Sequence, residues 1–213
     1  MLPAALFKRM KRVAAGAAVS ATPFQFLLAA FRAFLYRHTR EEDVVLLLVD
    51  NTRPHAAFDD VIGYFVSLVP LRCRGYCDGA FDALLGRVAA GVLDAMAHSR
   101  VPFEIIIDAV GADASNTRHF PVGQVVNYLP KSTAPKFSAK EFQIEEIKVT
   151  DMVGTCELAV DAMENADGSL GLKLEFDCSL YSAKHMVRFW DNLLVFLVQV
   201  IKDYQTPIAD VKI

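Results

Sequence analysis

The segment VIGYFVSLVPLR, at Val61–Arg72, has the apolar residues of a β-strand, and a glycine interrupts them near the start. Gly63 interrupts the apolar run, and a residue without a side chain lets the backbone turn sharply or approach a neighbour closely. Pro70 has no amide N–H to donate, so a fully paired central strand is disfavoured at that point. The segment therefore predicts a strand over about Tyr64–Arg72 that is entered through a tight bend.

A second segment, HSRVPFE at His98–Glu104, marks a junction between two helices. A helix-like run ends near its first residue. Pro102 then opens a new apolar turn, and proline is common in the first turn of a helix because its fixed φ already fits. We expect a long helix over Gly79–His98 and a short one over Phe103–Val110.

In the rest of the chain, the spacing of apolar residues predicts the remaining helices and strands. Further helices are expected at Leu6–Ala17, Pro23–His38 and Ser182–Tyr204, and further strands at Asp43–Val49, Val122–Leu129, Phe142–Val149, Glu157–Glu164 and Leu170–Asp177. The continuous apolar run of the strand at 43–49 is typical of a strand buried on both faces. The last two strands are joined by Asn165–Gly168, which predicts a hairpin. This order of elements predicts an α/β fold of the α+β sandwich type, with a mixed sheet packed with helices, in a single domain over residues 1–213.

Composition excludes several classes of function. Apolar residues make up 54% of the chain, and 22 Lys and Arg face 25 Asp and Glu, for a net charge of −3. Because phosphate binding needs a basic surface, no nucleic-acid partner is expected. No apolar run reaches the roughly 20 residues of a membrane span, so no membrane partner is expected either.

The four cysteines and five histidines show no metal-ligand spacing. Cys73, Cys77, Cys156 and Cys178 are too few for a disulfide scaffold, so we expect free thiols in a reducing, cytoplasmic setting and no metal site.

Both quoted segments resemble signatures of condensation domains from nonribosomal peptide synthetases and hybrid polyketide megasynthases. Ile62–Leu68 is similar to the family's I-G-x-F-V-N-x, with Ser67 in place of Asn, and His98–Glu104 is similar to its H-x-x-x-P-F-E. Asn51-Thr52-Arg53 resembles a Gly-Arg turn in which Thr replaces Gly, and Phe120–Val125 a weakened P-L-F-Q strand. The resemblance spans nearly the whole chain in family order and looks especially like fungal polyketide and peptide hybrid synthases.

The resemblance implies one chloramphenicol-acetyltransferase-like lobe, the C-terminal one. The family's H-H-x-x-x-D-G motif lies on the N-terminal lobe and is absent from this sequence, so no catalytic residue is expected here. His55 and Asp59 share the H-x-x-x-D spacing, but the following glycine is missing and the lobe is the wrong one. The implied role is half of an acyl tunnel and part of a docking surface for a carrier protein, whose phosphopantetheine is the only cofactor involved.

Several side chains are candidates for the tunnel or its frame. Arg53 is interpreted as a partner for a carboxylate or a phosphopantetheine phosphate, or as a loop salt bridge. Polar residues on apolar strands either line the tunnel or are satisfied by neighbouring backbone; these are Ser67, Gln124, Asn127 and Tyr128. The structural motif residues are Gly63, His98, Pro102 and Phe103, and His98 is either a helix cap or an anchor near the tunnel.

Three hypotheses follow for the chain as a whole. An N-terminal condensation lobe, or the rest of a megasynthase, completes an amide-forming enzyme. Alternatively, the half-domain binds an acyl or polyketide-like ligand and guides its cyclisation by shape and desolvation. In the third, the apolar face left by a missing lobe pairs with itself as a homodimer.

Overall fold

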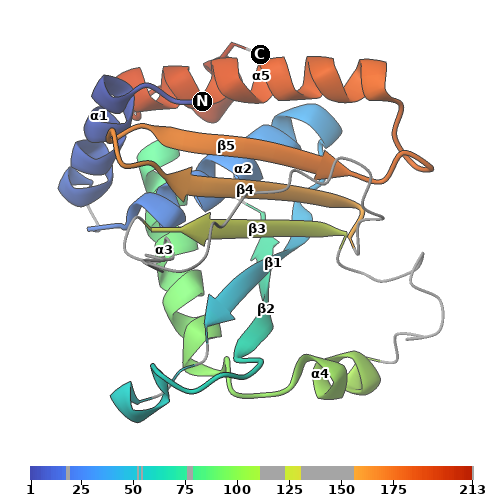
Figure 1. Ribbon diagram of the computed structural model, residues 1–213. Helices are drawn as coiled ribbons and strands as arrows, with labels where there is room; N and C mark the ends of the chain where they lie inside the picture. Colours follow the sequence, from blue (N-terminus) through green and yellow to red (C-terminus); the bar gives the residue numbers. More distant parts are fainter. Residues whose placement is uncertain are drawn as a thin grey trace, which may run out of the picture.

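A five-stranded mixed sheet lies at the centre of the computed structural model, which describes residues 1–17, 20–51, 53, 55–75, 79–110, 123–130 and 156–212 (Figure 1). The strand order is β2–β1–β3–β4–β5. The strands are β1 (Asp43–Asn51), β2 (Val66–Arg74), β3 (Gln124–Leu129), β4 (Leu158–Glu164) and β5 (Leu170–Phe176). β3 pairs in parallel with β1 and β4, whereas β2 and β5 pair antiparallel with their neighbours. The predicted mixed sheet is confirmed, and the strand expected at Phe142–Val149 lies outside the described residues.

Four of the described α-helices cover one face of this sheet: α1 (Ala4–Gly16), α2 (Pro23–Thr39), α3 (Phe81–Ala97) and α5 (Ala183–Lys202). A fifth, α4 (Phe103–Ala109), lies apart from them beyond β2, and short 3-10 helices form at Ala56–Phe58 and Ile208–Asp210. Side chains of α1, α2, α3 and α5 share one hydrophobic core with the strands, and in Figure 1 α2 and α3 lie behind the sheet. All five predicted helices are present, each within a few residues of its expected bounds.

The β1 strand is buried on both faces, as its continuous apolar run predicts. Leu46 and Leu48 point into the core shared with the helices, and Leu47, which points the other way, is only 3% exposed. The strand is also an inner one, lying between β2 and β3.

Local signals set the ends of α2 and α5. The Thr22 hydroxyl accepts a hydrogen bond from the Gln25 N–H at 3.2 Å, and the Gln25 side-chain oxygen accepts one from the Thr22 N–H at 2.8 Å. This reciprocal cap satisfies two amides that would otherwise lack a partner at the helix start. Pro23 occupies the first helical position, as expected, and Ser182 caps α5.

The β4–β5 hairpin forms at the predicted turn. Gly168 adopts φ +82°, a left-handed conformation that glycine reaches without steric cost, and its N–H donates to the Asn165 carbonyl at 3.1 Å. Asp167 accepts hydrogen bonds from the N–H and the hydroxyl of Ser169.

The β2 strand lies at the edge of the sheet, which explains how it accommodates Pro70. It begins at Val66 rather than at Tyr64, because the bend at Gly63 extends further than the apolar pattern suggests. A Cβ at Gly63 would lie 3.0 Å from Cε2 of Phe65, so a close approach to this ring accounts for the glycine.

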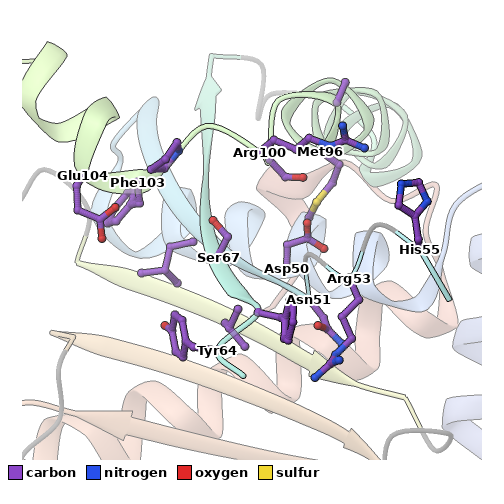
Figure 2. A pocket seen from close by; sticks show the side chains of 16 residues that line it. Asp50, Asn51, Arg53, His55, Tyr64, Ser67, Met96, Arg100, Phe103 and Glu104 are labelled. Atoms are coloured by element: carbon purple, nitrogen blue, oxygen red, sulfur yellow. The ribbon is translucent and has the colours of Figure 1, made fainter. Parts of the chain in front are cut away.

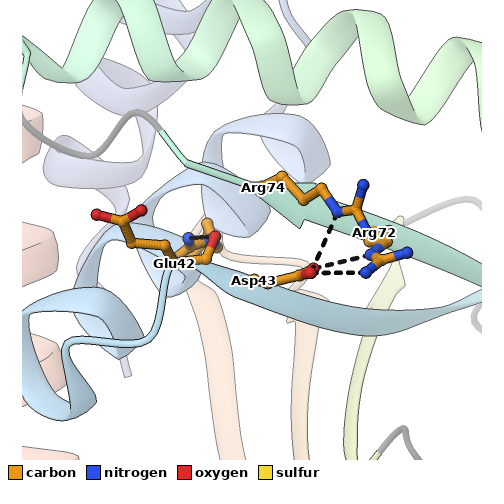
Figure 3. Close-up of polar contacts among 5 residues, drawn as sticks. Glu42, Asp43, Arg72 and Arg74 are labelled. Carbon is orange, nitrogen blue, oxygen red and sulfur yellow. Dashed lines mark hydrogen bonds and ion pairs between the residues drawn. The ribbon is translucent and has the colours of Figure 1, made fainter.

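Two arginines of the edge strand hold the first residue of β1 (Figure 3). Arg72 donates from Nε and Nη2 to the two carboxylate oxygens of Asp43 at 2.8 and 2.6 Å, and Arg74 donates from Nε at 3.1 Å. The Arg72 hydrogen bonds, opposed by partial desolvation and assisted by Arg74, lower the pKa of Asp43 from 3.8 to about 2.

This carboxylate predicts a specific pH dependence of stability. Because its folded-state pKa is depressed, its contribution is fully present above pH 3.8 and is lost as the pH falls toward 2. When the pH is lowered from 5 to about 2, the free energy of unfolding measured in urea should fall for the wild-type protein. It should fall less for Asp43→Asn. Equal pH slopes for both proteins would contradict the assignment.

Candidate functional site

An open cleft lies where the two opening sequence segments meet, and its volume is about 1030 Å³. Its wall is built from the end of β1, the start of β2, the end of α3, the start of α4 and four residues between the two strands, Arg53, His55, Tyr64 and Phe65 (Figure 2). Two segments that are distant in the sequence therefore form one concave surface, because α3 crosses the sheet and returns the chain beside β2.

Arg53 fixes the shape of the segment at one side of the cleft. Its Nη1 donates to the backbone carbonyls of Val61 at 3.0 Å and of Phe58. Its guanidinium carbon lies 4.2 Å from the centre of the Phe65 ring, a cation–π contact. Among the described residues, the contacts of Arg53 are thus to backbone and to a ring rather than to a carboxylate, and its role toward a phosphate stays a prediction.

The segment held by Arg53 exposes several apolar side chains, and we call it the apolar arm (residues 55–66). Ile62 is 102% exposed and Tyr64 89%, and Phe58, Val61 and Val66 are each more than a third exposed. Clustered exposed apolar residues of this kind usually mark a surface that another protein covers.

Ser67 lines the cleft together with Asp50. The two residues pair across β1 and β2, so their side chains point to the same face of the sheet. Figure 2 shows both on adjacent strands, with the Asp50 carboxylate beside Met96 at the end of α3. Asp50 is absent from the sequence-based candidates. Its signal is a carboxylate that directly ends the apolar run of β1.

The three candidates on β3 do not lie in this cleft. Gln124 and Tyr128 point to the face covered by helices, and Asn127 to the opposite one, because side chains alternate along a strand. Tyr128 donates a hydrogen bond to Glu164, which also pairs with Lys11 at 3.9 Å. Burial and this carboxylate raise the pKa of Tyr128. The structure does not bring these three residues together with Arg53 and Ser67, and their tunnel role stays a prediction.

Of the four structural motif residues, two line the cleft and two, Gly63 and His98, do not. Pro102 and Phe103 line it, with Pro102 immediately before the first residue of α4. His98 is the exposed cap residue at the end of α3, and its Nδ1 lies 2.9 Å from the Asp94 carbonyl. Its contacts favour the capping interpretation. His55 and Asp59 lie on the apolar arm, where His55 stacks on Phe58.

Within the described part of the chain, no group of three or more His, Cys, Asp or Glu side chains is placed to hold a metal ion. Cys73, Cys156 and Cys178 form no disulfide there, whereas Cys77 lies outside it. The described helices include none that is long and apolar enough to cross a membrane.

The fold and the two signature segments at its cleft define the class of protein. Residues 2–213 match the family model described as the condensation domain, and the chain belongs to this family. It is 40% identical over 214 residues to the hybrid PKS-NRPS synthetase pynA of Aspergillus niger and 42% identical over 213 residues to the hybrid PKS-NRPS synthetase pyvA of Aspergillus violaceofuscus. Both matches cover 100% of this chain but only 5% and 6% of those proteins.

A solved structure supports the same fold. The condensation domain from the monacolin K polyketide synthase MokA superimposes with a TM-score of 0.79 at 22% identity. The match covers 98% of this chain and 47% of that one, so this chain spans about half of the solved domain. The predicted family and α/β fold with a mixed sheet are confirmed.

Proposed function

We propose that this chain is the C-terminal half of a condensation domain, and that its cleft holds part of a carrier-bound intermediate during amide bond formation in natural-product biosynthesis. The observation that carries the proposal is the cleft, since both signature segments of the family contribute to its lining. Concave sites with a mixed apolar and polar lining are the usual places for small ligands.

The reaction joins an amine to a thioester. The amine nitrogen attacks the thioester carbonyl carbon, the C–N bond forms, the C–S bond breaks, and the thiol of phosphopantetheine leaves with the amine proton. This chain contributes shape and positioning, which supply a large part of the barrier reduction in such reactions. The acid–base histidine comes from an N-terminal half, because the sequence here contains no H-H-x-x-x-D-G motif.

Two partners belong to this function, a carrier protein and an N-terminal condensation lobe. A carrier protein delivers its phosphopantetheine arm, the only cofactor in the scheme, to the cleft. The N-terminal condensation lobe covers the apolar arm, where Ile62 and Tyr64 project almost fully into solvent. Burial of large apolar side chains of this kind contributes about 1.5–3 kcal/mol each.

The apolar arm also favours a second candidate function, a non-catalytic half-domain that dimerises and binds a polyketide-like ligand. In that case a second copy would cover Ile62 and Tyr64. Light scattering of the purified chain separates the two: a dimer that an Ile62→Asp substitution dissociates supports the second candidate, and a monomer supports the first.

A substitution that fills the cleft tests the proposed function. Ser67→Trp, introduced into the synthase that contains this chain, should reduce the released amide product by about 100-fold, because small displacements of reacting groups have effects of this size. Intact-mass analysis should then find acyl and aminoacyl groups still loaded on their carriers.

Val187→Trp is the matched control, because it places the same bulky side chain at an exposed position of α5 away from the cleft lining, and it should retain product formation within about twofold. Normal product formation by a folded Ser67→Trp synthase would rule out this cleft as the substrate site.

A further inference from the structure

The cleft contains a carboxylate, Asp50, that makes no hydrogen bond or ion pair with another side chain or backbone group among the described residues. Asp50 is half-buried at the end of β1. An unpaired carboxylate that is partly removed from water is costly, and a ligand that carries a positive charge offsets that cost.

No cationic side chain among the described residues forms an ion pair with Asp50. Arg53 lines the same cleft, but its guanidinium is directed to the carbonyls of Phe58 and Val61 and to the Phe65 ring. The remaining ionisable residues of the lining are exposed; they are His55, Tyr64, Arg100 and Glu104. Met96, beside Asp50, belongs to the last turn of α3, where the helix carries partial negative charge.

A hydroxyl group is placed to assist. Ser67 pairs with Asp50 across the two strands and points to the same face, so its oxygen can accept a second N–H hydrogen bond from one ligand. Leu68, Met96 and Phe103 supply apolar surface around these polar groups. The combination suits an amino group attached to an apolar body.

We propose that Asp50 binds the amino group of the acceptor substrate as an ammonium ion, with Ser67 as the second contact. This inference rests on the proposed function and adds to it one specific contact, a charge-assisted hydrogen bond from the amine of the acceptor to Asp50. Asp50 is a binding and selectivity residue here. The ammonium ion loses its proton to solvent or to a base before the nitrogen attacks.

The test compares two probes on the purified 213-residue chain. One is phenylalanine joined to aminopantetheine through a stable amide, and the other is its N-acetylated form, which cannot carry the positive charge. NMR titration should show wild-type protein binding the free-amine probe about tenfold more tightly, since a charge-assisted hydrogen bond contributes an effect of this size.

Three substitutions test whether Asp50 is responsible for the preference for the free-amine probe. Asp50→Asn should bind both probes equally, whereas Glu104→Gln and the control Asp60→Asn, an exposed acid on the apolar arm outside the cleft lining, should keep the preference for the amine. Circular dichroism and urea unfolding confirm that each variant is folded.

The outcomes separate this inference from the proposed function. Equal binding of both probes to wild-type protein, or a preference that survives Asp50→Asn, overturns the role of Asp50 and leaves the cleft as a pantetheine site. Binding of neither probe to the wild-type chain overturns both.

Discussion

Replacement of Phe34 by alanine should lower the free energy of unfolding by about 3–5 kcal/mol, the usual cost of removing a fully buried aromatic ring. Phe34 on α2 has no exposed surface. Its ring centre lies 5.0 Å from that of Phe189 in an edge-on contact and 5.9 Å from that of Phe196, so it joins α2 to α5. Loss of the ring leaves a cavity between the two helices that hold the sheet.

Urea denaturation of the purified chain measures this effect. Val187→Ala is the matched control, because Val187 is 61% exposed on α5, and it should change stability by no more than about 0.5 kcal/mol. Comparable losses for the two variants would show that the α2–α5 contact does not limit the stability of the chain.

Replacement of Arg32 by methionine should raise the free energy of unfolding by about 1–4 kcal/mol, although it removes a charged residue from the middle of a helix. The Arg32 side chain is fully buried on α2. Its Nη2 donates to the Glu42 carbonyl at 2.8 Å, but Nε and Nη1 have no hydrogen-bond partner within the described part of the chain. A buried charge with so few partners costs several kcal/mol.

Replacing Arg32 by methionine does not leave the Glu42 carbonyl without a hydrogen-bond donor. The Glu42 carbonyl also accepts a hydrogen bond from the Gly75 N–H at 2.8 Å, so it remains satisfied in the methionine variant. Arg32→Ala removes the same charge and the packing of the stem as well, and it should be less stable than Arg32→Met by about 2–3 kcal/mol. A methionine variant less stable than wild type would mean that the guanidinium makes a net favourable contribution.

Much of the fold could be predicted because its signals are local. Thr22, Pro23 and Gln25 lie within four residues, and hydrogen bonds over that distance decide where α2 begins. Similarly, Asn165–Gly168 predicts its hairpin because glycine accepts the left-handed φ of the turn. The start of β2 was placed two residues too early, since the contact of Gly63 with Phe65 has no signature in the apolar pattern.

The candidate site was predicted less completely. Arg53 and Ser67 line the cleft with Pro102 and Phe103, as their motifs suggest. Gln124, Asn127 and Tyr128 were grouped together, although strand alternation already places Asn127 on the other face. The sequence does not single out Asp50, because a carboxylate at a strand end is ordinary, and only its pairing with Ser67 and its place beside Met96 distinguish it.

The sequence by itself determined the helices, most strand bounds, the mixed α/β class and the family resemblance, because these depend on periodicity, caps and short motifs that act over a few residues. The tertiary structure alone decided that β2 is an edge strand, that the end of α3 returns beside β2, and that Asp50, which has no partner among the described residues, lies in the resulting cleft. Strand order and the juxtaposition of distant segments depend on burial of a shared apolar core, which no single stretch of sequence specifies.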